Sequence, residues 1–445
     1  LYIKDMYEAE TLIAKRLRLL AHSEEIKYKD LDDKIKQIET QQGILYTDEQ
    51  LEAIKLALTR KVAVITGGPG AGKSTILKGI LDLFKLLKAS NKIRLEEQIA
   101  LLAPTGRASK RMSEITKFEA STIHRFLKWN KDTNRFQINE YNKSKVSFVI
   151  VDEASMIDTM LLANLLKGLY SSCHIIFVGD ANQLPAVAAG DVLNDMIESK
   201  VLPVYTLKHW HRQGSNSTII PFAHKINEGI LDRTLLNSND DLTFIPCKDN
   251  EIIDVISNIC KHYDPSKLQV LAPIYKTRNG IYTINDSLQA LWNPKSYSKR
   301  EIRGTDSIYR EFDKVIQLTN MKDESVFNGD IGVIERIKTN PLKEIDIDYD
   351  CGLVPYKASM FQNFMLAYAI SIHKSQGSEF DTVLIPFTLD YGKMLYRKLI
   401  YTGVTRCKKK LILVGDINAL EKAIMNNEER GRRTSLKIFL ENGII

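Results

Sequence analysis

The stretch GGPGAGKST (67–75) decides the fold that we predict for this chain. It directly follows the apolar run KVAVIT (61–66) and precedes ILKGILDLFKLLK (76–88), which has the apolar spacing of a helix. The stretch fills the pattern G-x-x-x-x-G-K-[ST], in which glycines let backbone N–H groups converge on phosphate oxygens. The sequence therefore predicts a strand, a phosphate-binding loop and a helix in succession.

The residue types within this loop suit ATP and Mg²⁺. Lys73 can reach the β- and γ-phosphates, the Ser74 hydroxyl can bind Mg²⁺, and the helix N-terminus adds a partial positive charge. A glycine-rich turn without a ligand is the alternative interpretation. The residues predicted to contact the nucleotide are Gly67, Gly68, Pro69, Gly70, Ala71, Gly72, Lys73, Ser74 and Thr75.

A second apolar run, SFVIVDE (147–153), ends in two carboxylates. Asp152 is suited to hold Mg²⁺, and Glu153 to orient or deprotonate an attacking water. An acidic strand end alone is common in solvated loops, but here it accompanies the phosphate-binding loop. Lys73 and Asp152 together imply hydrolysis of a nucleoside triphosphate.

Composition sets the broad class. The chain has 445 residues, 44% of them hydrophobic, which suits a soluble globular protein of two to four domains. Five scattered cysteines without a C-x-x-C pair indicate neither a disulfide framework nor a cysteine zinc site, so we expect a cytoplasmic protein. No apolar run approaches the ~20 residues that span a bilayer. The net charge of +7 is a mild bias toward anionic partners. Since the first residue is Leu1, we expect the sequence to begin inside a longer natural chain.

Short apolar strands alternate with helix-length segments, which is typical of an α/β fold with parallel sheets. The predicted strands fall into two sets and therefore into two lobes: 61–66, 98–104, 147–153 and 174–180, then 267–273, 381–387 and 410–416. Between the later strands, residues 300–361 alternate and carry turn residues, which predicts a small β insertion with a tight hairpin turn at Asn328-Gly329. Residues 1–42 are charged and helical, and we interpret them as a linker or the tail of a missing N-terminal domain. RGRR (430–433) is interpreted as a solvated basic patch.

Three further side chains could act on the γ-phosphate. Gln183 lies just past a predicted strand end in GDANQLPAV (179–187), and Arg212 and Arg406 lie near predicted lobe boundaries. A P-loop enzyme needs cations on the charge that develops during phosphoryl transfer. Taken singly, each arginine is better explained as a surface salt-bridge partner.

The order of the motifs points to a family. The blocks are TDEQ (47–50), the loop, APTGRASKRM (103–112), STIHRFL (121–127), VDEAS (151–155), GDANQLPAV, HRQ (211–213), SIHKSQGSEFD (371–381) and YTGVTRCKKK (401–410). This order resembles superfamily 1 helicases, and its detail resembles the RecD-like group of superfamily 1B. The resemblance runs from about Tyr46 to the C-terminus. Ala186, His211 and Ser371 depart mildly from the expected pattern. These departures bear on the details of how nucleotide and DNA are coupled and not on the use of ATP.

The resemblance implies an ATP-dependent DNA helicase that moves 5′ to 3′ on single-stranded DNA, acting as a monomer. It implies two RecA-like domains, 43–204 and 205–299 with 362–445, a β-hairpin insertion at 126–146 and an SH3-like insertion at 300–361. Gln50 would contact adenine, Gln183, Arg212 and Arg406 would contact the γ-phosphate, and Gly377 and Glu379 would link nucleotide to DNA. The implied strand contacts are Thr105, Gly106, Arg107, His124, Ser371, His373 and Ser375.

Several alternatives stay open at this stage. The chain could be the helicase part of a conjugative relaxase, a nucleotide-gated DNA clamp or remodeller that does not unwind, or a motor on RNA. Within the predicted hairpin, Trp129, Phe136 and Tyr141 could hold a strand junction or could simply pack the hairpin onto its lobe.

Overall fold

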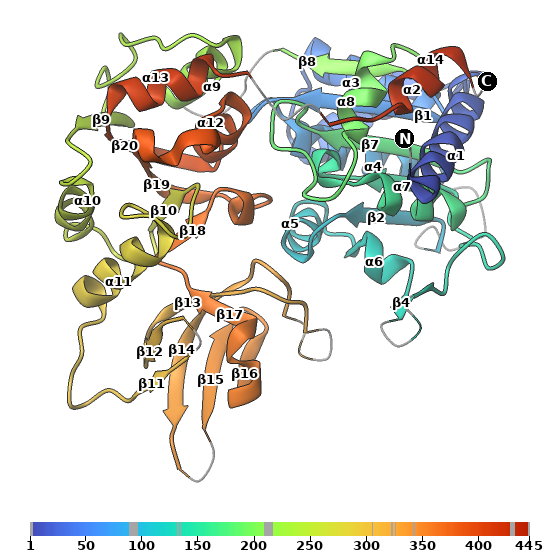
Figure 1. Cartoon of the computed structure of the whole chain (residues 1–445). Helices are drawn as coiled ribbons and strands as arrows, with labels where there is room; N and C mark the ends of the chain where they lie inside the picture. The colour runs from blue at the N-terminus through green and yellow to red at the C-terminus, as the bar shows by residue number, and fades with distance from the viewer. Residues whose placement is uncertain are drawn as a thin grey trace. The chain divides into compact units, whose positions relative to one another are not determined.

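The computed structural model describes residues 3–88, 97–130, 133, 135–208, 217–304, 306–321, 324, 326–340, 343–427 and 432–443. The chain divides into two compact units (Figure 1). Unit 1 comprises residues 1–213 and 430–445, and unit 2 comprises residues 214–429.

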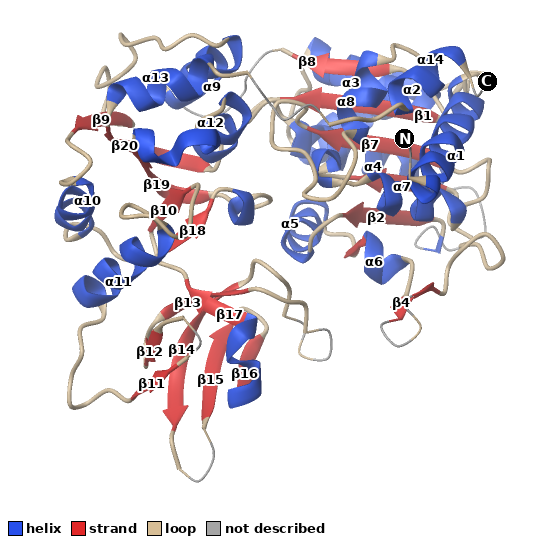
Figure 2. Ribbon diagram, viewed as in Figure 1, coloured by secondary structure: helices blue, strands red, loops and turns tan. Residues whose placement is uncertain are grey.

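Unit 1 is built around a parallel sheet with the strand order β3-β2-β6-β7-β1-β8 (Figure 2). Its strands are β1 (Val62–Gly67), β2 (Ile99–Ala103), β3 (Ala120–Thr122), β6 (Phe148–Val151), β7 (His174–Gly179) and β8 (Val204–Leu207), with a hairpin of β4 (Trp129–Asn130) and β5 (Arg135–Phe136). Its helices are α1 (Lys4–Ala21), α2 (Leu31–Gln42), α3 (Asp48–Thr59), α4 (Lys73–Lys88), α5 (Gly106–Thr116), α6 (Ile123–Phe126), the 3₁₀ turn η2 (Ala154–Met156), α7 (Thr159–Lys167), α8 (Val192–Glu198) and α14 (Leu436–Asn442). The four strands predicted for the first lobe are confirmed as β1, β2, β6 and β7.

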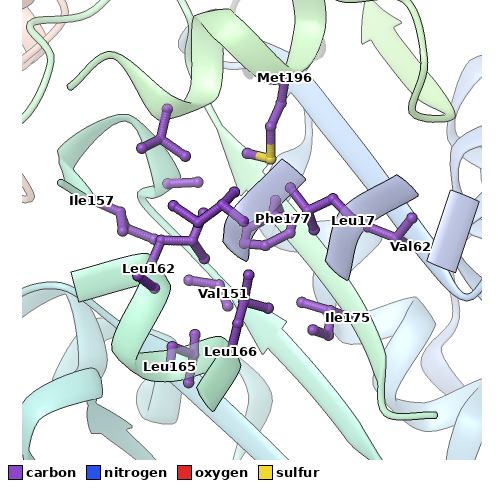
Figure 3. Packing of buried hydrophobic residues seen from close by; sticks show 14 of the residues in the cluster. Leu17, Val62, Val151, Ile157, Leu162, Leu165, Leu166, Ile175, Phe177 and Met196 are labelled. Carbon is purple, nitrogen blue, oxygen red and sulfur yellow. The ribbon is translucent and has the colours of Figure 1, made fainter. Parts of the chain in front are cut away.

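Both faces of the strands β1, β2, β6 and β7 are buried, which explains why these strands are unbroken apolar runs. Alternate residues of β1 enter different clusters: Val62 and Val64 join one, and Ala63 and Ile65 the other. Figure 3 shows the first cluster, in which Leu17 of α1 lies with side chains of the sheet, α7 and α8. The strand that leads into the phosphate-binding loop, β1, is therefore packed on both faces.

The structure corrects the prediction for residues 1–42. Ile13 and Leu17 of α1 are fully buried in the same cluster as Val62, and Ile35 of α2 is buried in the cluster on the other face of the sheet. Because these helices complete the core of unit 1, they are not a free linker or the tail of another domain.

Unit 2 contains a second parallel sheet, ordered β18-β10-β19-β20-β9. Its strands are β9 (Leu242–Pro246), β10 (Leu268–Ala272), β18 (Ala369–Ser371), β19 (Phe380–Phe387) and β20 (Cys407–Gly415). Its helices are α9 (Ile219–Glu228), α10 (Ile252–Cys260), α11 (Ile281–Trp292), α12 (Arg397–Val404) and α13 (Ile417–Met425), with 3₁₀ turns η4 (His373–Ser375) and η5 (Leu389–Met394). The three strands predicted for the second lobe are confirmed as β10, β19 and β20.

The predicted β insertion is confirmed as antiparallel. A sheet ordered β16-β15-β14-β13-β17 lies between β10 and β18 in the chain, next to the pair β11 and β12. The strands are β11 (Glu301–Arg303), β12 (Ile308–Arg310), β13 (Lys314–Gln317), β14 (Ile331–Lys338), β15 (Glu344–Tyr349), β16 (Gly352–Lys357) and β17 (Phe364–Leu366), with the 3₁₀ segment η3 (Ala358–Asn363). Asn328-Gly329 is a turn just before β14, but it does not join β13 to β14 directly, so the predicted tight hairpin is wrong.

The C-terminal boundary also differs from the prediction. Residues 362–445 were predicted to belong to one domain, whereas the described residues 432–443 belong to unit 1. Leu436 and Leu440 of α14 are fully buried in the cluster that contains Leu17. No helix in the described ranges is both long and apolar enough to cross a bilayer.

Candidate nucleotide and nucleic-acid sites

The phosphate-binding loop joins β1 to α4 in the predicted way. Gly72 has φ of +81°, a left-handed conformation that a side chain would strain. Lys73 begins α4, and its Nζ donates to the carbonyl oxygens of Gly67 at 2.6 Å and Gly68 at 2.9 Å. The ammonium group is thus folded over the loop itself, at the helix N-terminus where phosphate oxygens are favoured.

The acidic pair lies at the end of β6. Burial and the neighbouring Glu153 raise the pKa of Asp152, while the charges of Lys73 and Arg111 act in the opposite direction. Since β6, β7 and β1 are neighbouring parallel strands, the carboxylate and the loop share one edge of the sheet. Glu153 has φ of +51°, which is uncommon for a residue with a side chain.

The chemistry of these side chains fits Mg²⁺. A carboxylate with a raised pKa gains from a nearby cation, and Ser74 adds a second hard oxygen. No cluster of three or more acidic, histidine or cysteine side chains that could hold a metal occurs among the described residues. Mg²⁺ does not need one, because it is held by one or two carboxylates together with substrate phosphates.

Gln183 lies beyond the end of β7, the strand between β6 and β1. Its Nε2 donates to Asp180 Oδ2 at 3.2 Å, and its buried Oε1 has no hydrogen-bond partner. The turn is joined to the P-loop strand because the Ala181 N–H donates to Thr66 Oγ1 at 3.3 Å. An unsatisfied buried amide oxygen is costly, which is typical of a side chain whose full set of partners includes a ligand or water.

Gln50 is already engaged in its own helix. Its Oε1 accepts from the Thr47 N–H at 3.1 Å, and the Thr47 hydroxyl accepts from the Gln50 N–H at 3.4 Å. This capping box fixes the start of α3 and buries the Gln50 side chain. Contact with adenine therefore stays a prediction for this residue.

Two arginines were predicted to contact the γ-phosphate. Arg212 lies outside the described residues. Arg406 is buried within unit 2, where its guanidinium donates to the Thr402 carbonyl, the Ser378 carbonyl and Thr405 Oγ1, each at 3.2 Å. The loop that begins at Gly377, with φ of +73°, is therefore tied to the end of α12.

In unit 1, the residues predicted to contact the DNA strand lie at the ends of the β-strands β2 and β3. Thr105 caps α5 by accepting from the Ala108 N–H at 3.2 Å, and Gly106 and Arg107 form the first turn of that helix. His124 is exposed in α6, with its ring centroid 6.4 Å from that of Trp129. Because β2 and β3 are adjacent and parallel, the structure brings these residues to one edge.

The aromatic residues of the predicted hairpin could hold a strand junction or could pack the hairpin onto unit 1, and the structure shows a different environment for each. Trp129 and Phe136 are paired across β4 and β5 with ring centroids 4.6 Å apart, and Phe136 packs against the core of unit 1. Tyr141 is 93% exposed. Packing explains Trp129 and Phe136, and Tyr141 alone is fully presented to solvent.

In unit 2, the predicted DNA contacts lie at the last residue of β18, Ser371, and in the turn η4 that follows it. The buried hydroxyls of Ser371 and Ser375 serve the turn itself: Ser371 accepts from the Lys374 N–H at 3.2 Å, and Ser375 donates to the Ile372 carbonyl at 2.7 Å. Burial lowers the pKa of His373. Glu379 pairs with Lys408 at 3.5 Å.

Arg111 is a cation of α5 whose charge acts on Asp152, and no sequence motif singled it out. It lies four residues after Arg107 on α5, so the two share a helix face, and its charge lowers the pKa of Asp152. The i, i+4 spacing was the available signal, but the facing carboxylate comes from β6 and becomes visible only in the tertiary structure.

The fold and the loop geometry define a P-loop protein with two RecA-like parallel sheets. Three protein-family models match the chain: an AAA domain at residues 50–189, an ATP-dependent RecD-like DNA helicase SH3 domain at 284–349 and a UvrD-like helicase C-terminal domain at 366–414. The SH3 match overlaps the β insertion of unit 2.

Similar proteins agree with these matches. The ATP-dependent RecD2 DNA helicase of Deinococcus radiodurans is 30% identical over 440 residues, covering 98% of this chain and 58% of that protein. The RecBCD enzyme subunit RecD of Mycobacterium tuberculosis is 28% identical, covering 88% of this chain and 73% of that protein. The chain is thus similar to RecD-like helicases along nearly its whole length.

Solved structures support the fold alone. A structure of two coordinating Pif1 helicases at forked double-stranded DNA aligns with a TM-score of 0.54 at 17% identity, covering 87% of this chain and 95% of that one. Pif1 of Candida albicans aligns with a TM-score of 0.53 at 16% identity, covering 87% and 97%.

Proposed function

We propose that the chain is an ATP-dependent DNA helicase that moves 5′ to 3′ along single-stranded DNA and unwinds duplex. One observation carries the chemistry: Lys73, Asp152 and Gln183 lie after three neighbouring parallel strands, at one edge of the sheet of unit 1. The relative named ATP-dependent RecD2 DNA helicase supports the substrate, although this chain spans only 58% of its length.

The residues of unit 1 can share the work of hydrolysis. Lys73 would exchange its bonds to the loop carbonyls for bonds to phosphate oxygens. Ser74 and Asp152 would hold Mg²⁺, which when bound neutralises charge on the phosphate oxygens. Glu153 would orient or deprotonate the attacking water, and the unpaired amide oxygen of Gln183 could accept a hydrogen bond from it.

In the proposed cycle, unit 2 contributes Arg406, and Arg212, which lies next to the boundary between the units in the sequence, is a second candidate. If these cations contact phosphate only when the two lobes are closed, ATP favours closure and its hydrolysis removes that preference. Alternating grip on the strand would then convert closure into a step. Grip through phosphates should weaken with salt, log K falling by ~0.7 per contact for each decade of salt on a single strand.

Hydrolysis and unwinding measured together test this proposal. ATP turnover should rise strongly with single-stranded DNA, and duplexes with a 5′ tail should be separated while duplexes with a 3′ tail are not. Stimulation by RNA instead of DNA would assign the motor to RNA. ATP-dependent DNA binding without strand separation would assign the chain to the clamp class. Turnover that is unaffected by any nucleic acid would contradict the proposal.

A further inference from the structure

An arginine from the C-terminal segment holds the loop that follows Gln183. The guanidinium of Arg432 donates through Nη1 to the carbonyls of Ala188 and Gly190, the latter at 2.8 Å, and through Nη2 to the carbonyl of Ala186. Three carbonyls of one short loop thus converge on one cation. The sequence analysis interpreted this arginine as part of a solvated basic patch, which is wrong for Arg432.

The same loop is held from its other side by α7. The Thr159 N–H donates to the Ala189 carbonyl at 3.2 Å, and a Cβ on Gly190 would lie 2.0 Å from Thr159 Oγ1. Gly190 has φ of +105°, so both its backbone and its surroundings require glycine. Between these holds the loop is open to solvent, as the 85% exposure of Val187 shows. Residues 183–186 are buried, whereas the position of the exposed residues 187–189 depends on these few bonds rather than on apolar packing.

Arg432 is itself anchored firmly within unit 1. Two residues later, Thr434 Oγ1 lies 2.9 Å from both Glu10 Oε1 and Asp195 Oδ2, and the Ser435 N–H donates to Glu10 Oε2 at 2.9 Å. α14 then lies against α1 and α8 (Figure 1). The guanidinium thus works from a fixed point on the core.

We propose that Arg432 is a positioning residue: it holds the loop that places the Gln183 amide where it contacts the γ-phosphate. Ala186, whose carbonyl is the first in the chain that Arg432 binds, is separated from Gln183 by two residues. Gln183 and Ala186 are both buried, so movement of the loop displaces the side-chain amide of Gln183. This inference rests on the proposed function. Arg432 does not touch the nucleotide in this scheme: it fixes the loop so that the amide need not be ordered during each turnover.

Three variants of the full chain test the role. Arg432→Ala should lower kcat for DNA-stimulated ATP hydrolysis by about 10- to 100-fold with little change in the affinity for ATP, since small misplacements act on the chemical step. Arg432→Lys should be intermediate, because an ammonium can donate to these carbonyls but lacks the planar fork. Arg433→Ala, at the exposed next arginine, is the matched control and should behave like the unmodified chain.

Two further measurements separate positioning from general destabilisation. Guanidinium ion at low millimolar concentration should partly restore the kcat of Arg432→Ala and should not affect Arg433→Ala. Gly190→Ala, which disturbs the loop from the α7 side, should reproduce the loss of kcat, and its combination with Arg432→Ala should cost less than the two losses multiplied. Unchanged kcat in Arg432→Ala, or an equal loss in Arg433→Ala, would overturn the inference.

Hydrogen exchange of the peptide spanning 181–195 gives a readout that needs no hydrolysis. Arg432→Ala should exchange faster there than Arg433→Ala, with the rest of the sheet of unit 1 unchanged. If the unmodified chain hydrolyses no ATP, the proposed function fails, yet this exchange difference still shows whether Arg432 orders the loop. Equal exchange in the two variants would refute the hold itself.

Discussion

Replacing Asp195 with asparagine should remove a pH-dependent cost from the packing of α14. Burial and, to a lesser degree, the carboxylates of Asp191, Glu10 and Glu198 together raise the pKa of Asp195 from 3.8 to about 7, against the opposing effect of the hydrogen bond from Thr434. On α14 the charge of Lys437 also faces this group. The Thr434 hydroxyl has one proton to donate, and the buried Glu10 competes for it.

The magnitude follows from that difference in pKa. One pKa unit corresponds to about 1.36 kcal/mol, so a pKa raised from 3.8 to about 7 means that the ionised form costs on the order of 4 kcal/mol at high pH. Because the folded state binds the proton more tightly, stability is highest below the unfolded pKa and falls as the pH rises through the folded one. Between about pH 5 and about pH 8 we expect a loss of about 2–3 kcal/mol in the free energy of unfolding.

Urea denaturation at several pH values, with hydrogen exchange of α1 and α14 as the local report, measures this loss. Asp195→Asn should show little dependence on pH over that range and should be the more stable form at the alkaline end. Glu198→Gln, an exposed carboxylate on the same helix, is the matched control and should change stability by about 1 kcal/mol or less. If Asp195→Asn and the unmodified chain lose stability in parallel as the pH rises, the burial argument fails.

Three substitutions test the nucleotide site. Lys73→Ala should abolish ATP hydrolysis and leave the affinity for single-stranded DNA nearly unchanged, which turnover and DNA titrations would show; normal turnover would contradict the site assignment. Glu153→Gln should lower kcat by about 10²-fold or more while ATP still binds, since general base catalysis contributes about 10²–10⁴-fold, and an unchanged single-turnover rate would exclude that role. Arg406→Lys should lower kcat by about 10³-fold or more with a smaller effect on ATP affinity; a loss of affinity alone would assign Arg406 to ground-state binding.

Local pattern predicted most of the sheet and the chemistry. Strands buried on both faces are continuous apolar runs, so β1, β6 and β19 could be predicted from the sequence alone. The loop at 67–75 is itself a sequence motif. Short or half-exposed strands such as β8 were not predicted, because four residues with a mixed burial pattern do not form a recognisable apolar run.

Tertiary packing decided what the sequence could not predict. α1 has an apolar stripe, but nothing local says that its partners are α7 and α14, which lies more than 400 residues away in sequence. Arg432 sits in a basic run typical of a solvated surface. Its role depends on three backbone carbonyls, and backbone acceptors leave no trace in side-chain patterns.

Lys73 and Arg406, two of the cations assigned to ATP, hold internal hydrogen bonds in the described structure, so phosphate binding is an exchange for them. Arg406 donates three such bonds, and replacing a neutral acceptor with a charged one gains about 1 kcal/mol per bond. If these gains occur only in the closed state, Arg406 supplies about 3 kcal/mol of preference, which is roughly 100-fold. A shift from 1:99 to 99:1 needs about 5.5 kcal/mol. Arg406 alone therefore cannot drive full closure in the proposed cycle, and a second cation must contribute a comparable share. Arg212 is the candidate in this sequence, so Arg212→Ala combined with Arg406→Lys should abolish the ATP-dependent change in DNA affinity that each single variant retains in part. Full retention in the double variant would mean that closure is driven by other contacts.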